Sequence, residues 1–114
     1  MINEKIEYVD FDKVDIRLGT IIHAEEYDKL KKPSILLKID FGKEIGVKKS
    51  SAQLRKNYIA KNLINKQIIA VTNFQPKQIG NVTSEVLVLG LPDHQNEPIL
   101  LSPSIKLENG VKLY

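Results

Sequence analysis

The feature that most constrains this chain is the spacing of its apolar runs. Short runs rich in Ile, Leu and Val recur at intervals of roughly ten residues, with turn residues between them. Parallel βαβ units need a crossover of a dozen or more residues, usually a helix, and these intervals hold no such helix. The pattern therefore predicts an all-β fold with small helices. The expected strands are residues 16–27, 35–42, 45–51, 67–74, 84–91 and 99–103.

An OB-fold, a small β-barrel with a helix after its third strand, matches this number and order of elements. The chain has 114 residues, the usual size of one domain, so residues 1–114 are predicted to form a single OB-fold β-barrel with five or more strands. A tight turn at Gly42–Glu44 is expected to join the second and third strands as a hairpin. Gly19, inside the first strand, predicts a bend or a bulge.

Two short helices are expected between the strands. Residues 11–15 follow Asp10, a residue type that caps helix N-termini, and therefore predict one short helix. Ser50 and Gln53 have the spacing of a capping box, which predicts a second helix directly after the third strand.

The composition indicates a reducing compartment and no membrane insertion. The chain has no Cys, which excludes disulfides and thiolate chemistry. No apolar run approaches the roughly 18 residues that a membrane-spanning helix needs. The acidic N-terminus lacks the basic and apolar regions of a signal peptide. A cytoplasmic protein is therefore expected.

No constellation of residues predicts catalysis. His23 and His94 are the only histidines, and neither has the second His, the Cys or the spaced carboxylate that would complete a metal site. The segment "GKEIGVKKS", residues 42–50, contains Gly-Lys but no long helix follows it, so it is not a phosphate-binding loop. No catalytic residue, metal site or cofactor is predicted, and a binding module is expected instead of an enzyme.

The charge of the chain is unevenly distributed. The net charge is +3, but the span from Lys29 to Lys66 holds eleven basic and two acidic residues, which leaves it near +9 and the flanks near −6. Such asymmetry indicates an anionic partner for one face. A solvated lysine surface explains the same charges equally well, so charge alone leaves both interpretations open.

Four segments, taken in order, carry a resemblance to a known family. They are "DIRLGTIIHAEE", "KIDFG…IGVKKSSAQL", "LINKQIIAVTNFQPKQIGNVTSEVLVLG" and "ILLSPSIKLENGVKL". Together they resemble the tRNA-binding domain family, most closely its stand-alone branch, the export-related chaperone CsaA. The resemblance implies an OB-fold homodimer. It implies binding to tRNA or tRNA-like structured RNA, and, in the CsaA branch, chaperone activity on unfolded or pre-export proteins.

The family's site motif has the form Asn-x-x-Pro-(Lys/Arg), then Gly, then Ser-(Glu/x)-Gly-Met. Val86 and Leu87 stand here in place of Gly-Met, and a valine in place of glycine can block the approach of a ligand to the backbone. The matching residues are Asn73, Pro76, Lys77, Gly80, Ser84 and Glu85.

Each polar residue of the motif has a chemistry that suits RNA. Lys77 can meet a phosphate, and Asn73 and Ser84 can donate hydrogen bonds to phosphate or sugar oxygens. Glu85 can accept from base edges or 2′-hydroxyls, or hold Lys77 in place. The alternative is an ordinary turn in which Asn73, Ser84 and Glu85 satisfy local backbone groups. The resemblance favours the RNA-binding interpretation.

Four further basic residues are candidates for RNA contacts. Arg17 can reach an anionic ligand or pair with Asp15 or Asp12, and a structural or mixed role is favoured. The other three border the expected binding face, where phosphate contact and plain solvation are equally plausible. They are Lys48, Lys49 and Arg55.

The aromatic residues bear on how RNA would be recognised. Only Phe41, Tyr58 and Phe74 lie in the middle of the chain, and no strand carries two of them. OB-folds that bind single strands stack bases on aromatic rings. Core or edge packing is expected for Phe41 and Phe74. Recognition of folded RNA by its backbone and shape is therefore predicted.

A polypeptide-binding chaperone is the alternative function. It would need an apolar groove, for which Ile35, Leu37 and Leu91 are candidates. A homodimer is expected for either function, because pairing across a two-fold axis would bury the free strand edges of a small barrel. The apolar residues of 6–11 and 99–114 are the expected interface.

Overall fold

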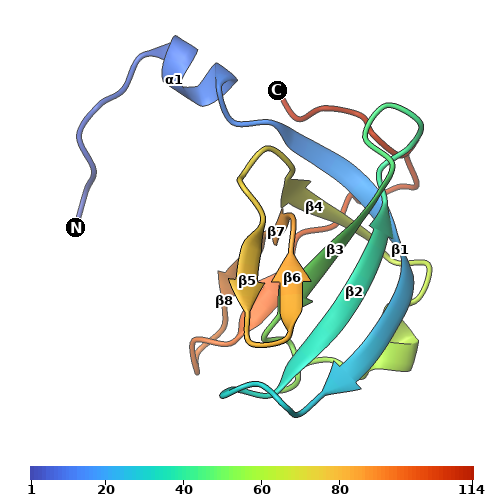
Figure 1. Cartoon of the computed structure of the whole chain (residues 1–114). Helices are drawn as coiled ribbons and strands as arrows, with labels where there is room; N and C mark the ends of the chain where they lie inside the picture. The colour runs from blue at the N-terminus through green and yellow to red at the C-terminus, as the bar shows by residue number, and fades with distance from the viewer.

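The computed structural model describes all residues, 1–114, as a curled β-sheet with two small hairpins and two short helices (Figure 1). Neither helix is long and apolar enough to cross a membrane. The helices are α1 (Tyr8–Asp12) and the 3-10 helix η1 (Ala60–Leu63); the strands are β1 (Ile16–Tyr27), β2 (Ser34–Asp40), β3 (Val47–Ala52), β4 (Gln67–Val71), β5 (Lys77–Ile79), β6 (Val82–Ser84), β7 (Leu87–Val88), β8 (Gly90–Pro92) and β9 (Pro98–Leu100).

The main sheet is antiparallel and has the order β3-β2-β1-β4-β7. Its curvature depends on β1, whose first half pairs with β4 and whose second half pairs with β2. The register shifts between Ile21 and His23, and such a bulge bends a strand and increases its twist. β5–β6 and β8–β9 form separate hairpins. The predicted all-β OB-fold is confirmed.

The core forms on the inner face of β2. Ile35, Leu37 and Ile39 alternate inward along this strand, as a strand with one buried face requires, and all three are buried. The prediction that Ile35 and Leu37 line an exposed groove is therefore wrong, because this alternation directs them into the core. Leu91 is exposed.

Gly19 makes room for an aromatic ring. It lies opposite Ile68 in regular register, and the bulge lies two to four residues further on, between Ile21 and His23, so the prediction of a bend or bulge at Gly19 itself is wrong. A Cβ at this position would lie 2.6 Å from Cγ2 of Ile39 and 2.7 Å from Cδ1 of Phe41. The absent side chain therefore lets the fully buried Phe41 ring pack directly on the backbone of β1.

A helix forms before β1 and another after β3, as predicted, but each begins at another residue than expected. α1 begins at Tyr8, and Asp10 acts from within the first turn, where its Oδ2 accepts a hydrogen bond from the Glu7 N–H (3.0 Å). Ser50 starts no helix. It pairs with Leu37 in the sheet, and its hydroxyl donates to the Val86 carbonyl (3.2 Å). Pairing along β2 thus overrides the local capping signal, and the helix forms later, at η1.

The expected strand at residues 84–91 is divided among β6, β7 and β8. The stretch before it, which has the composition of a loop, contains β5 and turns at Gly80, whose φ of 57° suits glycine. Beyond β9 the chain returns to β1, where the Leu113 N–H donates to the Ile16 carbonyl (2.9 Å). The N-terminal arm extends away from the sheet (Figure 1).

Candidate nucleic-acid interface

Asn73 joins the end of β4 to the start of β1. Its Oδ1 accepts from the Asp15 N–H (2.9 Å), and its Nδ2 donates to the Lys13 carbonyl (2.7 Å). Both polar atoms of the amide are therefore engaged with backbone groups that lie far away in sequence. This geometry makes Asn73 a connection between β4 and the segment after α1.

Ser84 and Glu85 bind the free edge of β3. The Ser84 hydroxyl oxygen accepts from the Ser51 N–H (3.1 Å), and Oε1 of Glu85 accepts from the Lys49 N–H (2.9 Å). The Glu85 N–H in turn donates to the Lys49 carbonyl (2.8 Å). These side chains supply the acceptors that a neighbouring strand would supply to an edge strand. They therefore fasten the β5–β6 hairpin to the sheet.

Lys77 is exposed and takes part in none of the ion pairs of the structure. It lies opposite Ser84 at the start of β5. The Glu85 carboxylate accepts from the backbone of Lys49 and forms no ion pair with Lys77. Lys77 is therefore free to meet an anion.

A cavity of about 550 Å³ lies beside Lys77. Phe74 and Leu87 line it, and their side chains are 57% and 50% exposed. Of the two positions predicted for Phe74, the core is wrong, since the ring follows the end of β4 and is largely exposed. Val86, by contrast, points into the core. Of the two departures from the family motif, Leu87 is the one that alters the exposed surface.

Arg17 is held by a network of its own. Its guanidinium donates to Asp15 (2.6 Å), to Glu44 (3.0 Å) and to the Gly110 carbonyl (2.9 Å). The hydrogen bond to Asp15 is the main cause that raises the pKa of Arg17. Asp15 also connects Arg17 to Asn73, so the two predicted residues meet through a shared partner.

Arg55 lies apart from the hairpin. Its guanidinium donates a hydrogen bond to Asp28, and this bond raises the pKa of Arg55. Its Nη2 lies 4.0 Å from Oε1 of Glu26. It borders a cavity of about 480 Å³ together with Lys32 and Lys56. Arg55 is thus already neutralised, and this corner is a basic surface separate from Lys77.

Lys48 and Lys49 are directed to opposite faces of β3, because successive side chains of a strand alternate. Lys48 lies opposite Ile39, a core residue, whereas Lys49 lies opposite the exposed Lys38. Lys49, Lys77, Ser84 and Glu85 therefore come together around the hairpin. Lys48 does not join them.

The sequence indicated Lys49 as a candidate contact but not the two residues that lie beside it on the outer face, His23 and Lys38. His23, Lys38 and Lys49 are direct register partners on β1, β2 and β3. All three line a cavity of about 220 Å³ that the hairpin residues 81–83 complete. The alternation of "ILLKID", with Lys38 between two inward positions, was a signal that could have placed Lys38 on this face.

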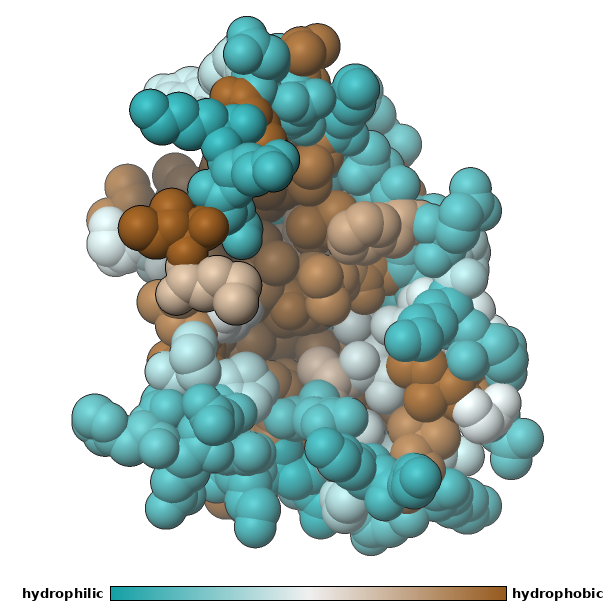
Figure 2. All heavy atoms as spheres, turned by 90° about the vertical axis from the view of Figure 1, so that its left-hand side faces the viewer, coloured by the Kyte–Doolittle hydropathy of each residue, from teal (hydrophilic) through white to brown (hydrophobic).

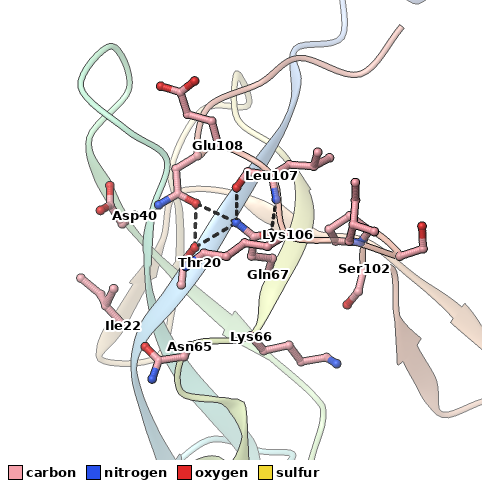
Figure 3. Close-up of a pocket in the computed structure, with 14 residues that line it drawn as sticks. Thr20, Ile22, Asp40, Asn65, Lys66, Gln67, Ser102, Lys106, Leu107 and Glu108 are labelled. Carbon is pink, nitrogen blue, oxygen red and sulfur yellow. Dashed lines mark hydrogen bonds between the residues drawn. The ribbon is translucent and has the colours of Figure 1, made fainter.

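A larger cavity, of about 700 Å³, lies between β1, β4 and the C-terminal segment (Figure 3). Gln67 crosses it with two hydrogen bonds to Leu107: Nε2 donates to the carbonyl (2.6 Å), and Oε1 accepts from the N–H (3.0 Å). The Thr20 hydroxyl donates to Oδ1 of Asn109 (2.6 Å). These contacts hold the C-terminal segment against the sheet, away from the motif residues. No group of three or more His, Asp or Glu residues could hold a metal ion.

Comparisons with known proteins agree on one family. The family model described as "Putative tRNA binding domain" matches residues 16–112. A crystal structure of chaperone CsaA from Bacillus anthracis is 46% identical, with a TM-score of 0.90 over 97% of this chain and all of that one. The CsaA chaperone protein of Picrophilus torridus is 49% identical, with a TM-score of 0.89 over 96% of this chain and all of that one.

A second kind of relative is much longer than this chain. The methionine–tRNA ligase of Pyrococcus horikoshii is 34% identical over 110 residues, which are 96% of this chain and 15% of the ligase. The chain thus spans about one sixth of the length of the ligases that it matches.

Proposed function

This chain belongs to the tRNA-binding domain family, and from that premise we propose that it binds tRNA or tRNA-like structured RNA as a non-catalytic module. The observation that carries the proposal is Lys77, an exposed and unpaired cation within the family motif. Lysine meets a phosphate as a point charge. tRNA works in the cytoplasm, which is where we place this function.

The other motif residues position the lysines. Asn73, Ser84 and Glu85 are each engaged with backbone groups, so we assign them to holding the hairpin and the end of β4 in place. Phe74 is the one strongly exposed phenylalanine, and a single ring cannot stack a run of bases. These features support recognition of the RNA backbone and its shape.

The proposal is tested by fluorescence anisotropy with labelled tRNA at several salt concentrations. We expect the logarithm of the affinity to fall steeply with the logarithm of salt concentration, since bound phosphates release counterions. Lys77→Ala should weaken binding and make this slope shallower by about 1. Lys13→Ala is the control, because Lys13, at the C-cap of α1, has an exposed side chain that lies 3.9 Å from Asp10 and outside the motif. An affinity indifferent to salt, or equal effects of the two variants, would contradict the proposal.

Binding of unfolded or pre-export polypeptides is the second candidate. Apolar atoms gather at the centre of the face that carries the N-terminal arm, β5 and β8, with polar atoms around them (Figure 2). Phe74, Leu87 and Leu91 are exposed apolar side chains, and exposed apolar patches mark interaction sites. An unfolded peptide probe in the same anisotropy experiment separates the candidates. Peptide binding that survives Lys77→Ala, beside weak and nonspecific tRNA binding, favours the chaperone.

We also propose that the protein is a homodimer joined through its terminal segments. Ile6, Tyr8 and Val9 before β1, and Ile105 and Leu107 after β9, expose apolar side chains that such an interface would cover. Sedimentation equilibrium should give about twice the chain mass of 12.9 kDa. Removal of residues 1–7 should shift the equilibrium toward the monomer. A monomer at all concentrations would refute this arrangement.

A further inference from the structure

The β5–β6 hairpin borders a second polar site that lies outside the family motif. We propose that the hairpin cleft, lined by His23, Lys38, Lys49, Asn81 and Thr83, binds a backbone phosphate of the RNA. The inference rests on the proposed RNA-binding function and adds to it two residues, His23 and Lys38, that the motif does not contain.

Strand register forces the basic side chains of the cleft together. His23 lies opposite Lys38, and Lys38 lies opposite Lys49, so the three form one row across β1, β2 and β3. Directly opposite residues have Cβ atoms about 4.5–5.5 Å apart, and like charges in that position destabilise a sheet. Neither lysine has an ion-pair partner in the structure. The pair of Lys38 and Lys49 therefore does not stabilise the fold, whereas an anion between the two ammonium groups would offset their repulsion.

The remaining lining adds hydrogen-bond donors. Asn81 enters the cleft from the hairpin and Ser51 from β3, whereas the Thr83 hydroxyl already donates to Oε1 of Gln78 (2.9 Å). Amide and hydroxyl groups of this kind commonly contact phosphate oxygens. The one acidic side chain of the lining is Glu25, whose Oε1 lies 3.7 Å from Nε2 of His23. The carboxylate thus lies beside the imidazole, and both lysines remain available.

The size and lining of the cleft select the ligand group. At about 220 Å³ it is smaller than the roughly 300–1,000 Å³ of pockets that enclose whole small molecules. No Phe, Tyr or Trp lines it, so the small imidazole of His23 is the one ring that a base could meet there. A phosphate of a polynucleotide backbone fits these properties, and a free nucleotide held by its base does not.

Hydrogen bonds between the β5–β6 hairpin and β3 hold the two sides of the cleft at a fixed separation. Ser84 and Glu85 bind the backbone of Ser51 and Lys49, the same β3 residues whose side chains line the cleft. Lys77 lines the neighbouring cavity from the other end of β5. One rigidly held hairpin therefore separates two places where RNA phosphates can bind.

The test compares Lys38→Gln, Lys38→Glu and the control Lys13→Gln by tRNA anisotropy and by thermal unfolding without RNA. We expect Lys38→Gln to weaken tRNA binding roughly tenfold, the loss of one charge-assisted hydrogen bond, and to make the salt slope shallower by about 1. Lys38→Glu should weaken binding further. It should nevertheless raise the melting temperature, because it creates an opposite-charge pair with Lys49.

The possible results distinguish a failure of the proposed phosphate site from a failure of the proposed RNA-binding function. If the wild type binds tRNA and Lys38→Gln behaves like Lys13→Gln, the cleft is not a phosphate site, while the proposed function stands. If the wild type binds no tRNA at any salt concentration, both proposals fall. A lower melting temperature of Lys38→Glu would show that Lys38 stabilises the fold, and this too would overturn the inference.

Discussion

Replacing Phe41 by alanine should lower the free energy of unfolding by about 3–5 kcal/mol, the usual cost of removing a buried phenylalanine ring. Phe41 is fully buried and belongs to the core cluster. A Cβ added at Gly19 would lie 2.7 and 2.8 Å from two of its ring atoms, so the ring fills the space directly above the β1 backbone. Small domains are stable by about 5–15 kcal/mol, so the variant should be close to unfolding.

Phe74→Ala is the matched control for this prediction. The same ring is removed, but from a side chain that is 57% exposed, so we expect a loss below about 1 kcal/mol. Urea denaturation followed by circular dichroism measures both variants. Equal losses at the two positions would mean that Phe41 does not occupy the core as described.

Glu85→Ala should weaken tRNA binding about fivefold to tenfold, although it removes a negative charge from a basic surface. The carboxylate accepts the Lys49 N–H, and without it the hairpin loses one of its attachments to β3. A lost hydrogen bond of this kind costs about 0.5–1.5 kcal/mol. A hairpin that moves relative to β3 no longer keeps Lys49 and Lys77 in fixed relative positions, and misplacement of contact residues lowers affinity.

The variant Glu85→Gln distinguishes the role of Glu85 in positioning the hairpin from the effect of its negative charge. Its side-chain carbonyl can still accept from the Lys49 N–H, so the hairpin should stay in place while the negative charge disappears. We therefore expect tRNA binding equal to or tighter than that of the wild type, measured by anisotropy. Hydrogen exchange of the Lys49 and Ser51 amides should accelerate in Glu85→Ala alone. If both variants bind tRNA more tightly, Glu85 acts only through its charge, and its positioning role is refuted.

The motif residues have a common physical role in this structure. Asn73, Ser84 and Glu85 bind backbone groups that lie 33 to 60 residues away in sequence, as local turn residues would not. Their role is therefore neither of the two alternatives that the sequence left open, a direct RNA contact or a local turn. These residues connect distant strands and, we propose, place Lys49 and Lys77 for the ligand.

The sequence by itself determined the fold class and the family. Apolar runs at 16–27 and 35–42 predicted β1 and β2 within two residues, because burial on one face imposes the strand pattern locally. Gly42–Glu44 likewise marked the hairpin between β2 and β3. The ordered motif segments predicted the family that the comparisons then identified.

Only the tertiary structure decided which side chains meet. Ser50 became part of a strand edge and not a helix cap, because pairing with β2 outweighs local preference. Phe74 lies beyond the end of β4, which stops at Val71, and faces solvent. The row of His23, Lys38 and Lys49 depends on the bulge in β1 and on the register of three strands. A shift of one residue would move each of these side chains to the other face, and register between strands far apart in sequence cannot be read from local composition.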